Sequence, residues 1–368
     1  MFARRSLLTG LLLALVACKG NQSSDAAQPS ASELAPAPAP KKDEAVSLNG
    51  AGATFPYPLY SKWIAEYAKV NPNVKINYQS IGSGGGIRQI VAGTVDFGAT
   101  DAPMKEEEAK GATGKLFHIP ATIGSVVVSY NLPEVTSPLK LTSEVLVGIY
   151  SGKIRKWNDP KIKADNADAK LPAKDIGVVY RTDGSGTTAV FTGYLATVSK
   201  EWSDSIGTGK SVNWPVGLGA KGNEGVTGQV KTTAYTIGYI ERAYASQNKL
   251  PMAELKNKAG KFVSPSIEAM SAAADAVEMP DELFVSLADA RGDAAYPITG
   301  YSYLLVYEDA KDAVKGEALA KYIWWGLHDG QKFSKDLDYA PVPAKVLVKV
   351  EARLKELRSG DKKLLSGA

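Results

Sequence analysis

The stretch Tyr180-Arg181-Thr182-Asp183-Gly184-Ser185-Gly186-Thr187-Thr188 follows an apolar run and precedes a segment whose apolar residues have helical spacing. This pattern predicts a strand, a glycine-rich loop and a helix whose first turn contains Ser185, Gly186 and Thr187. The first backbone N–H groups of a helix have no internal partners and therefore favour an anion. Arg181 and the two hydroxyls would add further hydrogen-bond donors. Taken alone, the stretch is equally typical of a helix that Ser185 or Thr187 merely caps.

Two earlier loops repeat this arrangement. Residues 79–86 join a strand pattern to a helical one and place Ser83 among glycines. Residues 49–56 precede the first helical pattern and place Thr54 beside two glycines. Glycine in such loops lets the backbone approach a ligand closely. Three loops of this kind at the starts of helices predict a pocket for an oxyanion.

Helical and strand patterns alternate along the chain from about residue 48. Helical patterns occupy residues 58–67, 87–91, 145–150 and 190–195, and strand patterns occupy 74–78, 125–130 and 176–180. This alternation predicts an α/β fold in which helices cover the sheets.

The N-terminus is typical of a lipoprotein signal peptide. An arginine pair at 4 and 5 precedes the uncharged stretch 7–17, about half the ~20 residues needed to cross a bilayer. The stretch ends in Leu15-Val16-Ala17-Cys18, which resembles a bacterial lipobox, whose cysteine takes the lipid. We therefore expect a signal peptide at 1–17, lipidation of Cys18 and a flexible, Ala- and Pro-rich tether at 18–47. The protein would then be exported and anchored to a bacterial membrane, facing the periplasm or the exterior. The arginine pair fits both a general and a twin-arginine export signal.

Composition excludes several function classes. With 43 basic and 39 acidic residues, the net charge of +4 provides no concentrated basic surface for nucleic acid. Because Cys18 is the only cysteine, the folded part cannot contain disulfides or thiolate sites. His118 and His328 are too few for a multi-histidine zinc site. We expect no metal and no cofactor.

Seven segments carry a resemblance to a known family. They are Gly50–Pro56, Ile81–Gly86, Val95–Pro103, Asp183–Thr187, Trp214–Gly219, Ile237–Tyr239 and Asp336–Ala340. In this order they resemble the signature segments of the phosphate-binding subunit of the phosphate-specific ABC transporter, over about residues 48–351. One departure is Gly84, where many relatives have serine, but the neighbouring Ser83 is retained.

The resemblance implies a hinged, two-lobe periplasmic-binding-protein fold of type II with the ligand in the cleft between the lobes. Lobe one would comprise residues 48–121 and 298–368, and lobe two residues 122–297. A monomer would bind inorganic phosphate and deliver it to the permease subunits of an ABC importer. The residues implied to bind phosphate are Thr54, Phe55, Ser83, Asp101, Arg181, Ser185, Gly186 and Thr187.

Asp101 would explain selectivity for phosphate. A carboxylate only accepts hydrogen bonds, so beside an anion it needs a ligand that carries a proton. Phosphate keeps a proton near neutral pH, whereas sulfate has none, and the carboxylate would repel it. The alternative for Asp101 is an aspartate that only caps a helix or stabilises a loop.

Two other functions compete with this interpretation. A secreted phosphate-ester hydrolase could use Ser83 or Ser185 as its nucleophile, but a serine nucleophile needs a base, and both histidines lie in apolar segments. Residues 217–222 match the dinucleotide-binding pattern G-x-G-x-x-G. We expect no strand to lead into that segment, because Trp214-Pro215 intervenes, and we reject the pattern.

Overall fold

The structure, a computed structural model, describes residues 45–365. The predicted signal peptide, lipidation site and most of the predicted tether therefore lie outside the described residues. Within residues 45–365, no helix is both long enough and apolar enough to cross a bilayer.

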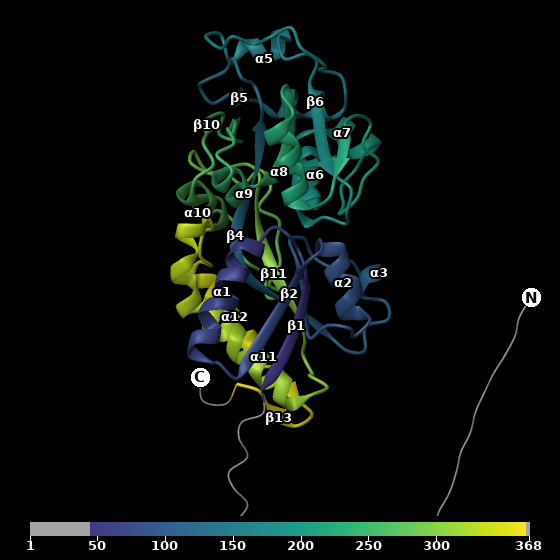
Figure 1. Ribbon diagram of the computed structural model, residues 1–368, viewed down its shortest axis with the longest axis vertical. Coiled ribbons are helices and arrows are strands. Elements are labelled where there is room, and N and C mark those ends of the chain that lie inside the picture. The colour runs from purple at the N-terminus through teal and green to yellow at the C-terminus, as the bar shows by residue number, and fades with distance from the viewer. Residues whose placement is uncertain (1–44, 366–368) are drawn as a thin grey trace, which may run out of the picture. The chain divides into compact units, whose positions relative to one another are not determined.

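An eight-stranded mixed sheet organises the described chain (Figure 1). Its order is β2 (Val74–Ser80), β1 (Val46–Gly52), β3 (Phe97–Thr100), β11 (Thr299–Tyr307), β4 (Leu116–Tyr130), β8 (Thr236–Glu241), β6 (Gly177–Arg181) and β7 (Leu218–Ala220). Strands β1, β2 and β3 are parallel and form what we call the first strand group. Strands β6, β7 and β8 are also parallel and form the second strand group.

The long strand β4 joins the two groups. Residues 116–125 of β4 pair antiparallel with β11, which also pairs with β3 of the first strand group. From Val126 onward, β4 pairs with β8 of the second strand group. The strand therefore changes partner between Ser125 and Val126. A strand of 15 residues extends over roughly 50 Å, which is enough to run through both groups.

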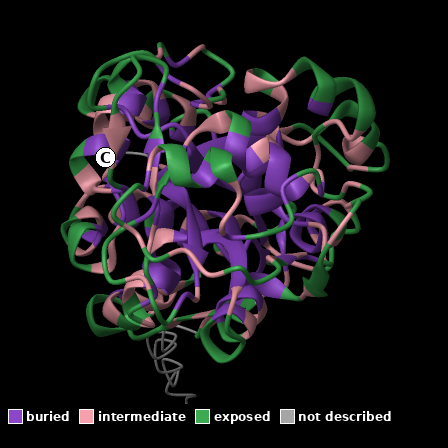
Figure 2. Ribbon diagram, turned by 90° about the horizontal axis from the view of Figure 1, so that it is seen from above, coloured by how far each residue is buried: buried purple, intermediate pink, exposed green. Residues whose placement is uncertain are grey.

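Helices and short strands surround this sheet. The helices are α1 (Tyr57–Val70), α2 (Ser83–Val91), α3 (Glu106–Ala109), α4 (Ser143–Tyr150), α5 (Pro160–Ala164), α6 (Gly186–Val198), α7 (Lys200–Ser205), α8 (Gly222–Thr232), α9 (Arg242–Gln247), α10 (Ile267–Asp275), α11 (Ala313–Leu327), α12 (Ala344–Leu354) and the 3₁₀ helices η1 (Asp329–Phe333) and η2 (Lys335–Leu337). Two small sheets contain β5 (Lys140–Leu141), β9 (Glu254–Lys256) and β10 (Phe262–Val263), and β12 (Arg358–Ser359) and β13 (Lys362–Lys363). Buried residues follow the strands of the main sheet, and exposed residues lie on the surrounding helices and loops (Figure 2).

The predicted α/β alternation is confirmed, with one local difference. The predicted strand at 125–130 is only the last part of β4, because residues 116–124 also enter the sheet by pairing with the distant β11. As expected, no strand leads into residues 217–222, because residues 211–217 contain none. Strand β7 forms inside that segment by pairing with β6, and α8 begins at Gly222.

Candidate functional site

The predicted anion-binding loops lie at the carboxyl ends of parallel strands from both groups. The loops after β1 and β3 carry Thr54 and Asp101, and Ser83 is the first residue of α2, directly after the loop that follows β2. Arg181 is the last residue of β6, and Ser185 ends the loop that follows this strand. In open α/β sheets, ligands bind outside the carboxyl ends of the strands. The fold thus brings together loops that are more than a hundred residues apart in sequence.

Direct hydrogen bonds join the loops of the two groups. The Gly84 N–H donates to the Gly184 carbonyl at 2.8 Å, and the Gly186 N–H donates to Ser83 Oγ at 3.1 Å. A Cβ atom on Gly186 would lie 2.4 Å from both Ser83 Oγ and Asp101 Oδ2, closer than real contacts allow. Glycine at 186 is therefore required for this approach.

The N-terminus of α6 contains a helix cap and polar groups that could bind a ligand. Ser185 is the N-cap, and its Oγ accepts a hydrogen bond from the Thr188 N–H at 3.0 Å. The Ser185 hydroxyl therefore caps the helix, and the Thr188 N–H fills one of the two acceptor positions of its oxygen. Thr187 does not cap the helix, because its Oγ1 accepts from Arg181 Nη1 at 3.3 Å. Ser185 and Thr187 are both buried.

Asp183 holds the Arg181 guanidinium in place. Arg181 Nε donates to Asp183 Oδ1 at 2.8 Å, and Nη2 pairs with Oδ2. Asp183 Oδ1 also accepts the Gly222 N–H at 3.0 Å. Burial by itself would raise the pKa of Asp183, but the ion pair with Arg181 and the Gly222 N–H hold it below its ordinary value. Arg181, which is 4% exposed, therefore has a fixed direction and leaves Nη1 directed at Thr187.

Asp101 is the buried carboxylate of the site. Ser302 Oγ donates to its Oδ1 at 2.8 Å, and Ser83 Oγ donates to its Oδ2 at 3.3 Å. Burial raises the pKa of Asp101 to about 7, against the opposing effects of the Ser302 hydrogen bond, the Arg181 charge and the Ser83 hydrogen bond. Near neutral pH, its protonation state therefore responds to small changes of environment.

Tyrosines from distant elements fix the loop that carries Thr54 and Phe55. Tyr244 OH donates to the Thr54 carbonyl at 2.6 Å. Tyr339 OH donates to the Phe55 carbonyl at 2.6 Å and lies 3.2 Å from Oε2 of the buried Glu241. Because both carbonyls have partners, this loop is held with its peptide orientation defined.

Asn223 links the two groups at the centre of the site. Its Nδ2 donates to Thr54 Oγ1 at 2.8 Å and to Thr187 Oγ1 at 3.2 Å, and its side chain is completely buried. Sequence reasoning missed Asn223, Ser302 and Tyr244, because each acts across the fold. The available signal was the rejected glycine pattern at 217–222, which directly precedes Asn223.

Neither histidine contacts a candidate nucleophile by hydrogen bonding. His118 Nε2 accepts the Met104 N–H at 3.0 Å, and burial lowers the pKa of His118 to about 4. His328 Nδ1 lies 2.7 Å from the Trp324 carbonyl, and its Nε2 lies 3.0 Å from Glu351 Oε1. Both imidazole rings have hydrogen-bond partners other than the candidate serines. The geometry therefore gives no support to Ser83 or Ser185 as an activated nucleophile.

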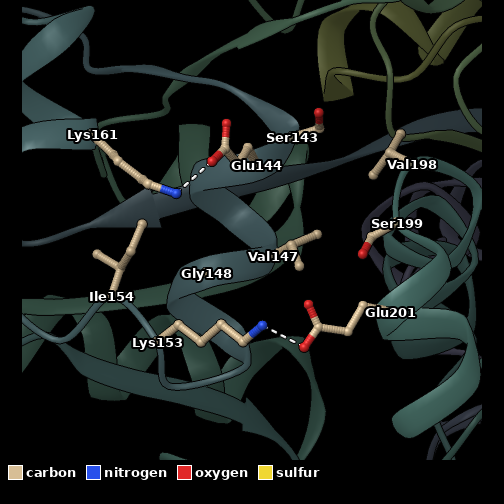
Figure 3. A pocket seen from close by; sticks show the side chains of 10 residues that line it. All are labelled: Ser143, Glu144, Val147, Gly148, Lys153, Ile154, Lys161, Val198, Ser199 and Glu201. Atoms are coloured by element: carbon tan, nitrogen blue, oxygen red, sulfur yellow. Dashed lines mark hydrogen bonds and ion pairs between the residues drawn. The ribbon is translucent and has the colours of Figure 1, made fainter.

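A separate hollow of about 280 Å³ lies beside α4 and α7 (Figure 3). Ion pairs between Lys153 and Glu201 and between Lys161 and Glu144 border it. All four charged side chains are more than half exposed, and no predicted site residue lines the hollow. Exposed pairs of this kind contribute little binding energy, so the hollow does not compete with the buried loops.

Known proteins have sequences similar to this chain. Residues 28–327 match the family model described as a PBP superfamily domain. Phosphate-binding protein PstS of Pasteurella multocida (strain Pm70) is 49% identical, with 88% of this chain and 94% of the relative aligned. Phosphate-binding protein PstS of Haemophilus influenzae is 45% identical, with 85% of this chain and 93% of the relative aligned.

A solved structure has a similar fold. A high-affinity periplasmic phosphate-binding protein bound with phosphate (PfluDING) has a TM-score of 0.68 at 22% identity. The match covers 83% of this chain and 93% of that protein. At this identity, the likeness concerns the fold, which is that of a periplasmic binding protein.

Proposed function

The chain belongs to the PBP superfamily and, within it, to the PstS phosphate-binding proteins. On this premise we propose that it binds inorganic phosphate between its two strand groups and delivers it to the permease subunits of an ABC importer. The observation that carries this proposal is the convergence of buried hydrogen-bond donors and one guanidinium around a single buried carboxylate, Asp101. Such a site suits an anion that retains one proton.

Each predicted residue receives a role in the proposed complex. Backbone N–H groups at Phe55 and Thr187 would donate to phosphate oxygens, as would the hydroxyl and backbone groups at Thr54 and Ser83 and the hydroxyl of Ser185. Gly186, whose N–H donates to Ser83 Oγ, would contribute by letting the backbone approach the anion closely. Arg181, already oriented by Asp183, would supply the cationic contact. Asp101 would accept the proton-bearing oxygen and repel sulfate.

We propose a binding protein rather than an enzyme. The relatives are named as binding proteins, and both histidines have partners away from the candidate serines. A hydrolase would need a base within hydrogen-bonding distance of its nucleophile. No specific observation favours the hydrolase alternative.

The lobe boundaries and the membrane anchor are further parts of the proposal. The partner change of β4 between Ser125 and Val126 supports a first lobe of 48–121 plus 298–368 and a second of 122–297. The lipobox-like sequence supports export as a lipoprotein anchored through Cys18 on the outer side of a membrane. We further propose that the protein acts as a monomer.

An anion titration tests the function. At pH 8, where Asp101 is mostly ionised, calorimetry of the purified chain should give saturable binding of inorganic phosphate, with no heat from sulfate and no turnover of a phosphate monoester. Absence of phosphate binding by folded protein would contradict the proposal, and release of phosphate from the monoester would favour the hydrolase instead.

A further inference from the structure

We propose that Asn223 is a positioning residue that turns the hydroxyl hydrogens of Thr54 and Thr187 toward the bound anion. The inference rests on the proposed phosphate site and concerns how that site recognises its ligand. Asn223 itself has no role among the expected ligand residues. It would act on phosphate through the two threonines, one from each strand group.

The orientation of the Asn223 amide follows from its neighbours. Its Oδ1 accepts the backbone N–H of Glu241 at 3.0 Å, and a backbone N–H can only donate. The atom facing Glu241 is therefore the oxygen, and the NH₂ group must face the opposite way. On that side, the NH₂ group meets the hydroxyls of Thr54 and Thr187.

Both threonine hydroxyls have their acceptor positions filled. Thr54 Oγ1 accepts from Asn223 Nδ2 at 2.8 Å and from the Asn223 backbone N–H at 3.3 Å. Thr187 Oγ1 accepts from Asn223 Nδ2 at 3.2 Å and from Arg181 Nη1 at 3.3 Å. A hydroxyl has two acceptor lone pairs and one hydrogen. Since both lone pairs are used, each hydroxyl can interact with a ligand only as a donor.

This arrangement restricts where a ligand proton can lie. A freely rotating hydroxyl could accept a hydrogen bond from a protonated phosphate oxygen, but these two cannot. Ser83 Oγ is similarly occupied, because it accepts the N–H groups of Gly186 and Asp101 at 3.1 and 3.3 Å. Two acceptors then remain for the ligand proton, Asp101 and the second lone pair of Ser185 Oγ. The carboxylate is the stronger acceptor because it is charged, so the proton-bearing oxygen is directed to Asp101. Asn223 would thus contribute to selectivity as well as to affinity.

The glycine pattern at 217–222 explains how Asn223 reaches this position. Gly222 has a φ of +72°, which favours glycine, and it immediately precedes Asn223 at the start of α8. The Gly222 N–H binds Asp183, which in turn holds Arg181. The same turn therefore positions both the guanidinium and the amide.

A double-mutant cycle on phosphate binding tests the inference. Asn223→Asp keeps an acceptor for the Glu241 N–H but replaces the NH₂ group by an oxygen, toward which the threonine hydroxyls would turn. We expect Asn223→Asp to lower phosphate affinity at least ~100-fold when Thr54 is present. In a Thr54→Val background, where only the Thr187 hydroxyl remains to be reoriented, we expect the loss caused by Asn223→Asp to be at least ~10-fold smaller. The added charge of the aspartate acts in both backgrounds and cancels from the comparison.

Ser302→Ala provides the matched control. Ser302 hydrogen-bonds Asp101 and shares no hydrogen-bond partner with Asn223. Its effect should therefore combine with that of Asn223→Asp additively, within about 2-fold. Coupling to Thr54 without coupling to Ser302 is the signature of hydroxyl orientation, because general loss of stability would affect both pairs alike.

The outcomes separate the inference from the proposed function. If wild-type protein binds phosphate and the Asn223 and Thr54 effects are additive, the positioning role is wrong while the phosphate site stands. If wild type does not bind phosphate, the proposed function fails first and the inference with it. Should Asn223→Asp not fold, as judged by circular dichroism, Asn223→Ala enters the same cycle. We then expect at least ~3-fold coupling, and additivity again overturns the role.

Discussion

Asp101→Asn should make sulfate binding independent of pH. In the wild-type site, Asp101 has a pKa raised to about 7 by burial. Above that pH the carboxylate is ionised and repels sulfate, whereas below it the carboxylic acid can donate a hydrogen bond to a sulfate oxygen. The threonines that Asn223 holds and the guanidinium that Asp183 holds keep the same hydrogen bonds over this pH range. Sulfate discrimination should therefore depend mainly on the proton of Asp101.

The magnitude follows from this titration. Above pH ~7 the protonated fraction of Asp101 falls about tenfold per pH unit, so the affinity of wild type for sulfate should fall by the same factor. Below pH ~7 the affinity for sulfate should be nearly constant. In Asp101→Asn, the amide donates at every pH, and the phosphate-to-sulfate preference at pH 8 should fall at least ~10-fold, or about 1.4 kcal/mol.

Stability should change in a related way. The pKa of a carboxyl group can be higher in the folded protein than in the unfolded chain. Such a group contributes its full stability below the unfolded pKa, and this stability is lost as the pH rises through the folded pKa. For Asp101 the window runs from 3.8 to about 7, and the full loss is about 4 kcal/mol. Ligand-free Asp101→Asn should lack this loss and should be more stable than wild type at pH 8.

Competitive calorimetry and denaturant unfolding between pH 5 and 8.5, at constant ionic strength, measure both effects. The reasoning is refuted if folded Asp101→Asn keeps the wild-type phosphate-to-sulfate preference and the wild-type pH profile. Another group would then sense the ligand proton.

The remaining predictions concern three other positions. Arg181→Ala should weaken phosphate binding by about 2–5 kcal/mol, and a calorimetric loss under ~0.5 kcal/mol would place Arg181 outside the site. Gly186→Ala should weaken phosphate binding at least ~10-fold, because its methyl group would meet Ser83 and Asp101 at 2.4 Å. Gly228→Ala is the control and should bind like wild type, because its methyl group would have no atom within 4 Å. Equal phosphate affinities of the two variants would contradict the proposed site. Cys18→Ser should release the protein from membranes without altering phosphate binding. Intact mass of the membrane-extracted wild type should show acyl groups on Cys18, and an unmodified N-terminus would exclude the anchor.

Local sequence patterns predicted the parts of the fold that local physics determines. The helical pattern at 145–150 is one example, since it lies within α4, and the side chain of Thr142 directly before this helix accepts the Val145 N–H at 3.2 Å. The loop from Arg181 to Thr187 was likewise expected between a strand and a helix, because glycines interrupt two regular apolar patterns. Such signals involve residues only a few positions apart.

The supporting residues of the site could not be predicted in this way. Asn223 contacts Thr54 across 169 residues, and Ser302 contacts Asp101 across 201. A single asparagine or serine has many possible roles, and nothing nearby in sequence distinguishes these two. The role of Ser302 depends on the pairing of β11 with β3 and β4, which is a property of the whole chain. The strand at 116–124 was missed for the same reason.

The insertion of β11 between β3 and β4 has a consequence for how the protein is made. Residues 97–130 supply both neighbours of β11 early in synthesis, but the strand that joins them is not complete until Tyr307 has been synthesised. Until then one edge of β3 and one edge of β4 lack their native partner, and unpaired edges are prone to aggregate. Contacts over such long sequence separations also slow folding. The sheet therefore stays open while residues 131–307 are synthesised. It is during this interval, rather than in the finished molecule, that a chaperone would have the most to protect.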